Sequence, residues 1–406
     1  MQNNSDITVM NDILHSIDTY NLVQSYSEPN YKKIMFYELC MIYENVIRHE
    51  DDICDQSNND DITECKLTET EELILNCIDF YDEHISITRS IRETTTTAYE
   101  YVTEDKIDLI RSYYQPPQKS EAWYNYRNQL ITASSAWKLL HTEASKNDYI
   151  YNKCKPFNLA KYKTVNIYSP FHWGNKYEDV SVSLYEHLYN VKVEDFGCIK
   201  HPKYEYIGAS PDGIVVSENK RGCMLEIKNI VNRDITGIPK KEYWIQTQLQ
   251  METCDLNDCD FLECRFKEYE NDDEFKNDGT FSKTKEGHYK GVMVQFFDGL
   301  NPLYEYAPFM CDETSFNSWN LSILEKNKDI TWIKNIYWYL PEYSCVHIKR
   351  NKLWFDSILP ILADSWRIIQ KEKKEGYEHR KPKQRVKTKK SNEDNILFSL
   401  DTIKQL

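Results

Sequence analysis

Three charged residues near the middle of the chain have types and spacing suited to chemistry. Asp212 lies in the segment Ser-Pro-Asp-Gly, and Glu226 and Lys228 follow in the segment Leu-Glu-Ile-Lys. Side chains alternate along a strand, so Glu226 and Lys228 project from the same face. If the preceding strand pairs antiparallel with theirs, Asp212 comes alongside. Neighbouring carboxylates repel and resist burial unless a cation neutralises them, so the three residues predict a metal site.

The chemistry expected of such a site is phosphodiester hydrolysis. Hard oxygen ligands suit Mg²⁺ or Mn²⁺, which retain waters and accept phosphate oxygens. Lys228 can orient an attacking water or offset charge that develops on phosphorus. An isolated Glu-x-Lys is more often a solvated ion pair on an exposed strand. The interpretation therefore depends on the segments that surround it.

The elements that must position these residues follow from hydrophobic periodicity. Strands are expected at 195–216 and 222–231, after a helix at 173–190 and before a glutamine-rich helix that begins at Pro239. Farther along, the pattern predicts strands at 258–266 and 290–297, a mobile acidic insertion at 267–287, and a final helix at 351–374 interrupted near Pro360. Upstream, Ser120 is expected to cap one helix and Thr132 or Ser134 the next. This order predicts an α+β fold with an α/β core, in which helices flank a mixed β-sheet.

The chain divides into three regions by composition. Residues 1–110 are expected to form a helical accessory domain, 111–375 the domain with the charged residues, and 376–406 a basic, disordered tail. The net charge of −15 argues against a nucleic-acid partner. However, residues 1–70 hold 14 acidic against 4 basic residues, whereas 371–390 hold 10 basic against 3 acidic. Because the charge is so uneven, the total does not decide the partner.

The twelve cysteines are too dilute for a disulfide scaffold. Cys254, Cys259 and Cys264 could form a metal or iron–sulfur site, but their spacing matches no ligand pattern, so buried reduced thiols are favoured. The sequence has no apolar run long enough to span a membrane and no secretion signal at its start. We therefore expect a soluble intracellular protein without a membrane partner.

Five segments in order resemble one nuclease family. They are Ala-Trp-Tyr-Asn-Tyr-Arg with Ile-Thr-Ala-Ser, the segment Trp-Gly-Asn-Lys-Tyr-Glu, the two core segments, and the glutamine helix. Together, over about residues 120–264, they resemble the lambda exonuclease and YqaJ-like viral recombinase nucleases of the PD-(D/E)xK, RecB-like superfamily. The composition and the added helical region suggest a member from a large DNA virus, similar to virophage-defence nucleases. The resemblance implies a restriction-endonuclease-like core.

The resemblance also implies roles for individual residues. Asp212 and Glu226 become metal ligands together with the carbonyl of Ile227, Lys228 becomes the catalytic lysine, and Glu178 contacts the metal directly or through water. Gln246 positions the lysine or the scissile phosphate, although Gln248 or Gln250 can take its place, and Gln248 is a further candidate for DNA binding. Arg127 and Ser134 hold a phosphate near the 5′ end of the DNA; alternatively, Ser134 only caps a helix. Gln129 stands where the family often has glycine, which bears on this 5′-end recognition.

The function expected from the resemblance is a Mg²⁺- or Mn²⁺-dependent DNA nuclease without an iron–sulfur cluster, most simply a 5′-to-3′ exonuclease on duplex ends. Its partners would be duplex DNA, further copies of the chain, and a helicase or single-strand annealing protein. Its place would be the host cytoplasm, in viral recombination, repair or defence. Two alternatives remain: an endonuclease or nickase with the same metal site, and a non-catalytic DNA-binding scaffold that keeps the nuclease fold.

Overall fold

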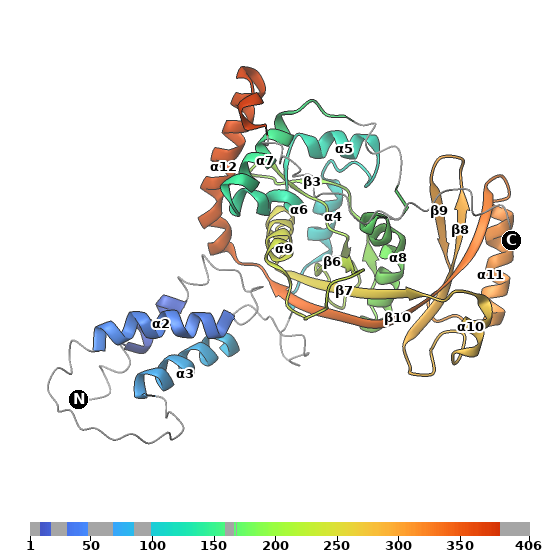
Figure 1. The fold of residues 1–406 in the computed structure, drawn as a ribbon, viewed down its shortest axis with the longest axis horizontal. Helices are drawn as coiled ribbons and strands as arrows, with labels where there is room; N and C mark the ends of the chain where they lie inside the picture. The colour runs from blue at the N-terminus through green and yellow to red at the C-terminus, as the bar shows by residue number, and fades with distance from the viewer. Residues whose placement is uncertain are drawn as a thin grey trace, which may run out of the picture.

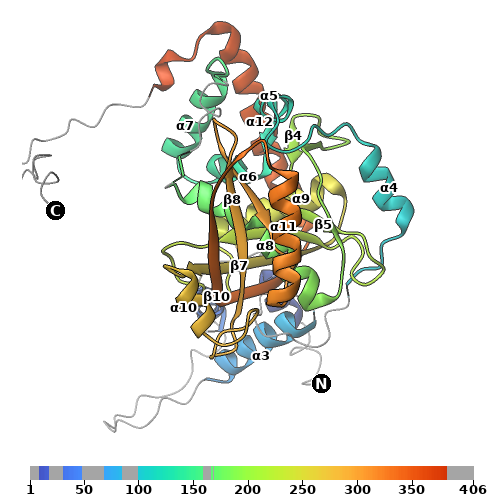
Figure 2. The same cartoon turned by 90° about the vertical axis from the view of Figure 1, so that its right-hand side faces the viewer.

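A computed structural model of the chain describes residues 9–17, 31–47, 68–84, 99–158, 166–167 and 169–381. Of the expected basic tail at 376–406, the part beyond residue 381 lies outside the described residues. Within the described ranges the chain combines helices with two β-sheets, as Figures 1 and 2 show. The predicted α+β class is therefore confirmed. No helix in these ranges is long and apolar enough to cross a membrane.

The larger sheet has seven strands in the order β2-β5-β6-β7-β10-β8-β9. Its strands are β2 (Val193–Glu194), β5 (Gly213–Val215), β6 (Met224–Asn229), β7 (Asp258–Glu268), β8 (Tyr289–Phe297), β9 (Pro302–Tyr306) and β10 (Thr331–Lys349). Strands β6 and β7 are parallel and their neighbours pair antiparallel, so the sheet is mixed, as predicted. The smaller sheet has the order β1-β4-β3, with β1 (Ile131–Thr132), β3 (Ile199–Lys200) and β4 (Ile207–Ala209).

Helices cover the strands on both faces. They are α4 (Glu104–Ser112), α5 (Glu121–Asn128), α6 (Ala133–Ala136), α7 (Glu143–Cys154), α8 (Pro170–Tyr189), α9 (Lys241–Cys254), α10 (Asp272–Asn277), α11 (Glu313–Lys326) and α12 (Lys352–Glu375). In Figure 1, α10 and α11 lie at the β8–β9 end of the molecule, and α7 and α12 lie at the other end. The N-terminal helices α2 (Tyr31–Ile47) and α3 (Glu69–His84) pack on each other around their own apolar cluster.

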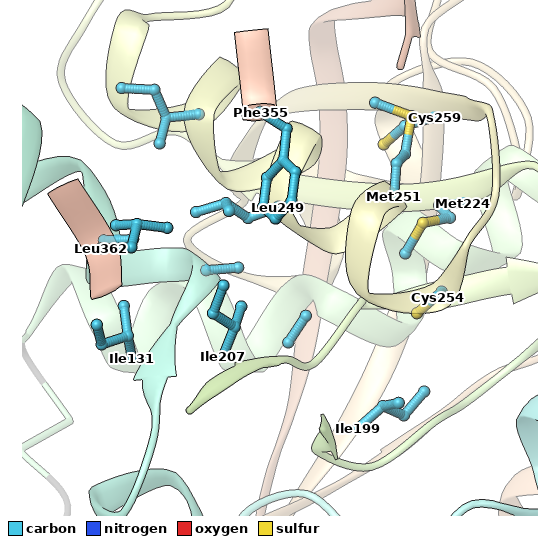
Figure 3. Packing of buried hydrophobic residues seen from close by; sticks show 14 of the residues in the cluster. Ile131, Ile199, Ile207, Met224, Leu249, Met251, Cys254, Cys259, Phe355 and Leu362 are labelled. Atoms are coloured by element: carbon cyan, nitrogen blue, oxygen red, sulfur yellow. The ribbon is translucent and has the colours of Figure 1, made fainter. Parts of the chain in front are cut away.

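Alternation along β7 divides the main core into two clusters. Cys259 and Phe261 belong to the cluster that α9 and α12 cover, part of which Figure 3 draws. Leu262 and Cys264 project from the other face of β7 and belong to the cluster beneath α8. The three cysteines considered as metal ligands are thus buried among apolar side chains, with Cys254 and Cys259 in one cluster and Cys264 in the other. This separation agrees with an apolar packing role for the thiols.

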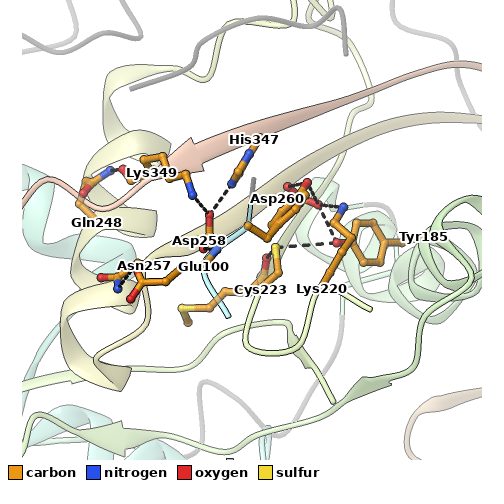
Figure 4. Close-up of polar contacts among 12 residues, drawn as sticks. Glu100, Tyr185, Lys220, Cys223, Gln248, Asn257, Asp258, Asp260, His347 and Lys349 are labelled. Carbon is orange, nitrogen blue, oxygen red and sulfur yellow. Dashed lines mark hydrogen bonds and ion pairs between the residues drawn. The ribbon is translucent and has the colours of Figure 1, made fainter. Parts of the chain in front are cut away.

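Two buried carboxylates lie at the start of β7 and connect it to neighbouring segments. Asp258 accepts hydrogen bonds from His347 (2.7 Å) and Lys349 (2.5 Å), and Asp260 accepts them from Tyr185 (2.6 Å) and Lys220 (2.5 Å), as Figure 4 shows. Each charge therefore meets a cation, as buried charges require. Helix α4 adds Ile107 and Ile110 to the cluster around α9. This helix spans the expected boundary at residue 110, and the three-region division itself stays a prediction.

The structure corrects three expectations about elements. The glutamine helix begins at Lys241 with Lys240 as its N-cap, and not at Pro239. Helix α12 continues through Pro360 without interruption, with this proline on its exposed side. The acidic insertion expected to be mobile contains α10, whose Phe275 is fully buried. The Ser120 cap is confirmed, because its hydroxyl accepts the N–H of Trp123.

Candidate active site

The predicted pairing that brings the core carboxylates together is confirmed. Strand β5 runs antiparallel to β6 with Gly213 opposite Leu225, so Asp212 and Glu226 follow at adjoining positions of the same ladder. Gly213 is required here because a Cβ atom at this position would lie 2.2 Å from the Val193 side chain on β2. The glycine lets β5 pack against β2, and Asp212 emerges at the end of the strand.

A cavity of about 510 Å³ gathers most of the predicted site residues. Its lining includes Ser134, Glu178, Asp212, Ile227, Lys228 and Gln246. Tyr243, which the sequence analysis did not single out, also lines the cavity and lies 5.1 Å below the Lys228 ammonium at its ring centroid. These residues come from five separate segments of the chain. Their convergence gives the cavity the composition of an active site.

Glu226 lies directly behind this cavity and is fully buried. One of its oxygens accepts hydrogen bonds from Lys228 and from Gln246 (2.7 Å), and the other accepts one from Gln250 at 2.6 Å. Gln246 and Gln250 are four residues apart and therefore share one face of α9. Gln250, which the sequence analysis held only as an alternative, thus joins Gln246 at this carboxylate.

Gln248 points to a different part of the molecule. Its amide nitrogen donates to the carbonyl of Lys349 (2.8 Å), and its oxygen accepts the N–H of Asn351 at 2.6 Å. Figure 4 shows it beside Lys349. Because it lies two residues from Gln246, it faces the other side of α9 and is only 1% exposed. The expected DNA contact through Gln248 therefore needs correction: this glutamine links α9 to the end of β10 and the start of α12.

The charges of the site oppose one another. Burial raises the pKa of Asp212 well above its ordinary value, and the negative charge of Glu226 raises it further, against the effect of Lys228. Burial alone would lower the pKa of Lys228, but the two carboxylates outweigh it and raise the pKa above the usual lysine range. Lys228 is therefore held as a cation between two acids. The site contains more negative charge than its single lysine offsets.

Helix α8 presents Glu178 at the edge of the cavity. Burial raises the pKa of this carboxyl, while Lys119, 3.2 Å away, opposes the shift. Asn229 at the end of β6 fixes the helix, because it donates to the carbonyl of Gly174 (2.9 Å) and accepts from Ser181 at 2.7 Å. The helix is thus tied to the strand that carries Glu226 and Lys228.

Arg127 connects α5 to the two segments beside the cavity. Its guanidinium donates to the hydroxyl of Ser134 (3.0 Å) and to that of Ser210 (3.1 Å), and it stacks on the Trp123 ring at 4.2 Å. Trp123 also donates to Ser210 at 3.1 Å. Ser134 lies inside α6, and Thr132 is the N-cap residue. Ser210 was missed by the sequence analysis, although its place two residues before Asp212 is a signal that could have identified it.

The donor chemistry of the cavity fits a hard divalent cation. Asp212 and Glu178 supply carboxylate oxygens at its wall, where Ile227 also lies. Burial and then the negative charge of Glu226 raise the pKa of Asp212, and a bound cation would offset both effects. Among the described residues, no three acidic, histidine or cysteine side chains yet converge as a complete metal-binding group. The reason is visible at Glu226, whose two oxygens face Lys228, Gln246 and Gln250.

Comparison with known proteins agrees with the resemblance read from the sequence. Residues 122–257 match the family model of the YqaJ-like viral recombinase domain, which confirms that resemblance. An uncharacterised protein, R354 of Acanthamoeba polyphaga mimivirus, is 27% identical over 344 residues, covering 74% of this chain. The chain spans 59% of the length of that viral relative.

Two solved exonuclease structures also align with the chain. An alkaline exonuclease from Laribacter hongkongensis aligns at 18% identity with a TM-score of 0.36, covering 64% of this chain and 95% of its own. A phage-related exonuclease from Haemophilus somnus aligns at 13% identity with a TM-score of 0.32, covering 68% of this chain and 97% of its own.

Proposed function

We propose that this chain, whose residues 122–257 match the family model of the YqaJ-like viral recombinase domain, is a metal-dependent deoxyribonuclease that hydrolyses phosphodiester bonds. The observation that carries the proposal is the cavity where Asp212, Glu178 and Ile227 meet Lys228, with Glu226 buried behind it. A charge cluster of this composition is costly to bury, and a structural role alone would be filled more cheaply by apolar residues.

In this proposal each residue of the site has a separate role. Asp212, Glu226 and the Ile227 carbonyl would hold Mg²⁺ or Mn²⁺, with Glu178 in contact directly or through water. When bound, such an ion lowers the pKa of a coordinated water and offsets the charge of the phosphoryl group. Lys228 supplies a fixed positive charge beside the reacting phosphate and can orient the attacking water. Gln246 and Gln250 fix the Glu226 carboxylate through its two oxygens.

The preferred substrate in this proposal is a duplex end degraded from 5′ to 3′. Arg127 supports it, because a planar guanidinium next to two hydroxyls is suited to grip a terminal phosphate. Holding that phosphate at a fixed distance from the metal cavity would place the next phosphodiester bond for cleavage. Participation in viral recombination, repair or defence, assembly with further copies, and a helicase or annealing partner are extensions of this proposal.

The test is a nuclease assay of the wild type and of Asp212→Ala on linear, nicked and circular duplex DNA, with Mg²⁺ and with chelator. We expect digestion of linear DNA only by the wild type and only with metal. Cutting of closed circles would favour an endonuclease or nickase with the same site. DNA binding by a folded wild type that cuts none of these substrates would favour the scaffold alternative. Full activity in chelator would contradict the metal site.

A further inference from the structure

Lys119 has a backbone conformation that lysine rarely adopts. Its φ angle is +64°, in the left-handed region, where the Cβ atom of any residue but glycine crowds the neighbouring carbonyl oxygen. The residue lies in the turn before α5, whose N-cap is Ser120. A strained residue of this kind persists only where its surroundings hold it, and such residues gather at functional sites. The contacts of Lys119 indicate what its side chain does there.

Gln118 holds this turn against the proposed metal site. Its amide nitrogen lies within hydrogen-bond distance of the Asp195 carboxylate (3.1 Å), the carbonyl of Phe196 (3.0 Å) and the carbonyl of Pro211 (3.0 Å). Pro211 directly precedes the aspartate that lines the cavity of the proposed metal site. The turn is therefore tied to the strand end that carries this aspartate, and the side chain of Lys119 extends from a fixed position.

The side chain of Lys119 reaches Glu178. Its ammonium lies 3.2 Å from a carboxylate oxygen of Glu178, and this is the single ion pair of that carboxylate among the described residues. The Lys119 side chain is 49% exposed and that of Glu178 is 24% exposed, so the pair lies at the rim of the cavity that Glu178 lines. An exposed ion pair contributes little to stability and would not require a left-handed backbone. The pair therefore indicates a role in the site and not only in the fold.

An ammonium and a divalent ion compete for the same carboxylate. A cation within a few ångströms of a bound ion repels it, because like charges interact strongly at this distance where bulk water does not screen them. We propose that Lys119 is a positioning residue that competes with the divalent ion for Glu178 and so lowers the affinity of the site for the metal. This inference rests on the metal site of the function proposed above, and it concerns a residue that contributes no ligand to that site.

The test measures metal binding without catalysis. Electron paramagnetic resonance of free Mn²⁺ gives the affinity of each protein in the absence of DNA, and the binding that remains in Asp212→Asn is subtracted. Lys119→Gly and Lys119→Asn remove the charge and introduce residues that tolerate a left-handed backbone. We expect both variants to bind Mn²⁺ about three- to tenfold more tightly than the wild type, because the ammonium no longer competes for Glu178.

Two further variants separate this charge from other effects. Lys119→Arg keeps a cation at the position and should bind Mn²⁺ as the wild type does. Lys192→Gln is the matched control for the loss of one surface charge. Lys192 pairs at 3.0 Å with Glu186, which lies on the same helix α8 but outside the cavity lining, so this variant should also keep the affinity of the wild type.

The results distinguish failure of this inference from failure of the proposed function. Equal affinity in the wild type and in both charge-free variants of Lys119, or weaker binding in those variants, would overturn the inference and leave the metal site in place. If the wild type binds Mn²⁺ no more strongly than Asp212→Asn, the metal site itself is wrong, and this inference with it. Melting temperatures in chelator verify that every variant is folded.

Discussion

At the scale of single residues, the site is defined by how one buried carboxylate is held. Glu226 is fully buried, and three side chains, Lys228, Gln246 and Gln250, donate to its two oxygens. Removing one partner from a buried charge costs more than the bond itself contributes, because the charge stays behind. The amides therefore fix where the carboxylate lies, which the chemistry of a metal ligand requires.

The sequence predicted the acidic residues and the lysine of the site, but not all of the side chains that hold them in place. Asp212, Glu226 and Lys228 could be found because strand alternation and charge repulsion together point to them. Gln250 could be ranked against Gln246 and Gln248 only once the phase of α9 relative to β6 was known. Ser210 was missed because its role depends on Trp123 and Arg127, which approach from a distant helix.

A first prediction concerns Asp212→Asn. The pKa of Asp212 is raised in the folded protein. At a pH between the ordinary aspartate pKa and this raised pKa, the folded protein keeps the proton and the unfolded chain has lost it. The contribution of Asp212 to the free energy of unfolding therefore falls as the pH rises between these two pKa values. In chelator at pH 7.5 the asparagine variant should therefore unfold at a higher temperature than the wild type. This advantage should shrink as the pH approaches 4.

Mg²⁺ provides the second half of this test. It should raise the melting temperature of the wild type but not that of Asp212→Asn, because the ion stabilises only the form that binds it. Asp356→Asn, which removes an exposed carboxylate on α12, serves as the charge-matched control. If the wild type unfolds at a higher temperature than Asp212→Asn in chelator at pH 7.5, the ionised Asp212 carboxylate does not destabilise the fold, and this explanation is wrong.

A second prediction separates the three glutamines of α9. Gln246→Ala and Gln250→Ala should each slow digestion of linear DNA about ten- to a hundredfold, because each removes a hydrogen bond to a charged group worth about 1.5–3 kcal/mol. Gln248→Ala is the matched control on the same helix. It should lower the melting temperature, through loss of its bonds to Lys349 and Asn351, while the folded protein keeps its rate. An equal loss of rate in all three would indicate that α9 acts only as a packing element.

At the scale of elements, helices and strands with a regular hydrophobic period could be predicted from the sequence. Elements whose period is interrupted or too short could not. The helix before the core strands and the β5–β6 pair were expected, because their periodicity and turn residues agree. The 19-residue strand β10 was not recognised, because Pro341 interrupts its pattern. The structure accommodates this proline at a register shift between Tyr339 and Glu342. Helix α10 was missed because one buried Phe275 in an acidic stretch gives no periodic signal.

A third prediction tests the link that Arg127 forms between α5, α6 and the segment before β5. Arg127→Ala should slow digestion of 5′-phosphorylated duplex ends by about ten- to a hundredfold, because it removes the charge-assisted grip on the phosphate, and slow 5′-hydroxyl ends much less. Arg127→Lys should not restore the difference, because a single ammonium cannot span both serine hydroxyls as the guanidinium does. Rates are measured on otherwise identical linear duplexes.

The wild type itself contains the decisive control for this third prediction. If it digests 5′-phosphorylated and 5′-hydroxyl ends at equal rates, Arg127 has no role in reading the end, and an internal cutter becomes the better interpretation. Equal slowing of both substrates by Arg127→Ala, with a lower melting temperature, would assign the residue to holding α5 in place.

At the scale of the whole molecule, charge is unevenly distributed, which bears on the proposed contact with DNA. The net charge is −15, yet cations gather in the segment 371–390 and around a cavity of about 520 Å³ lined by Arg127, Lys138, Lys153 and Lys155. Of that segment, the structure shows that Arg380 is anchored: it pairs with Glu372 at 2.5 Å and bonds Asn147 on α7 at 3.0 Å. Arg380 is therefore held by the folded part, and the cations after residue 381 lie outside the described residues.

A fourth prediction follows for the chain beyond this anchor. Deleting residues 382–406 removes six lysines and arginines against three acidic residues, while Arg380 keeps its contacts. The logarithm of DNA affinity against the logarithm of salt concentration should then have a shallower slope, by roughly 0.9 for each phosphate that the deleted cations neutralise. Cleavage of a short linear duplex at low salt should continue, because this segment contributes no residue to the proposed metal site. A full-length variant with glutamine at Lys383, Arg385, Lys387, Lys389 and Lys390 is the matched control, and it should show the same change. An unchanged slope in both proteins would mean that these charges do not reach DNA, and that the cations of the folded part bind it alone.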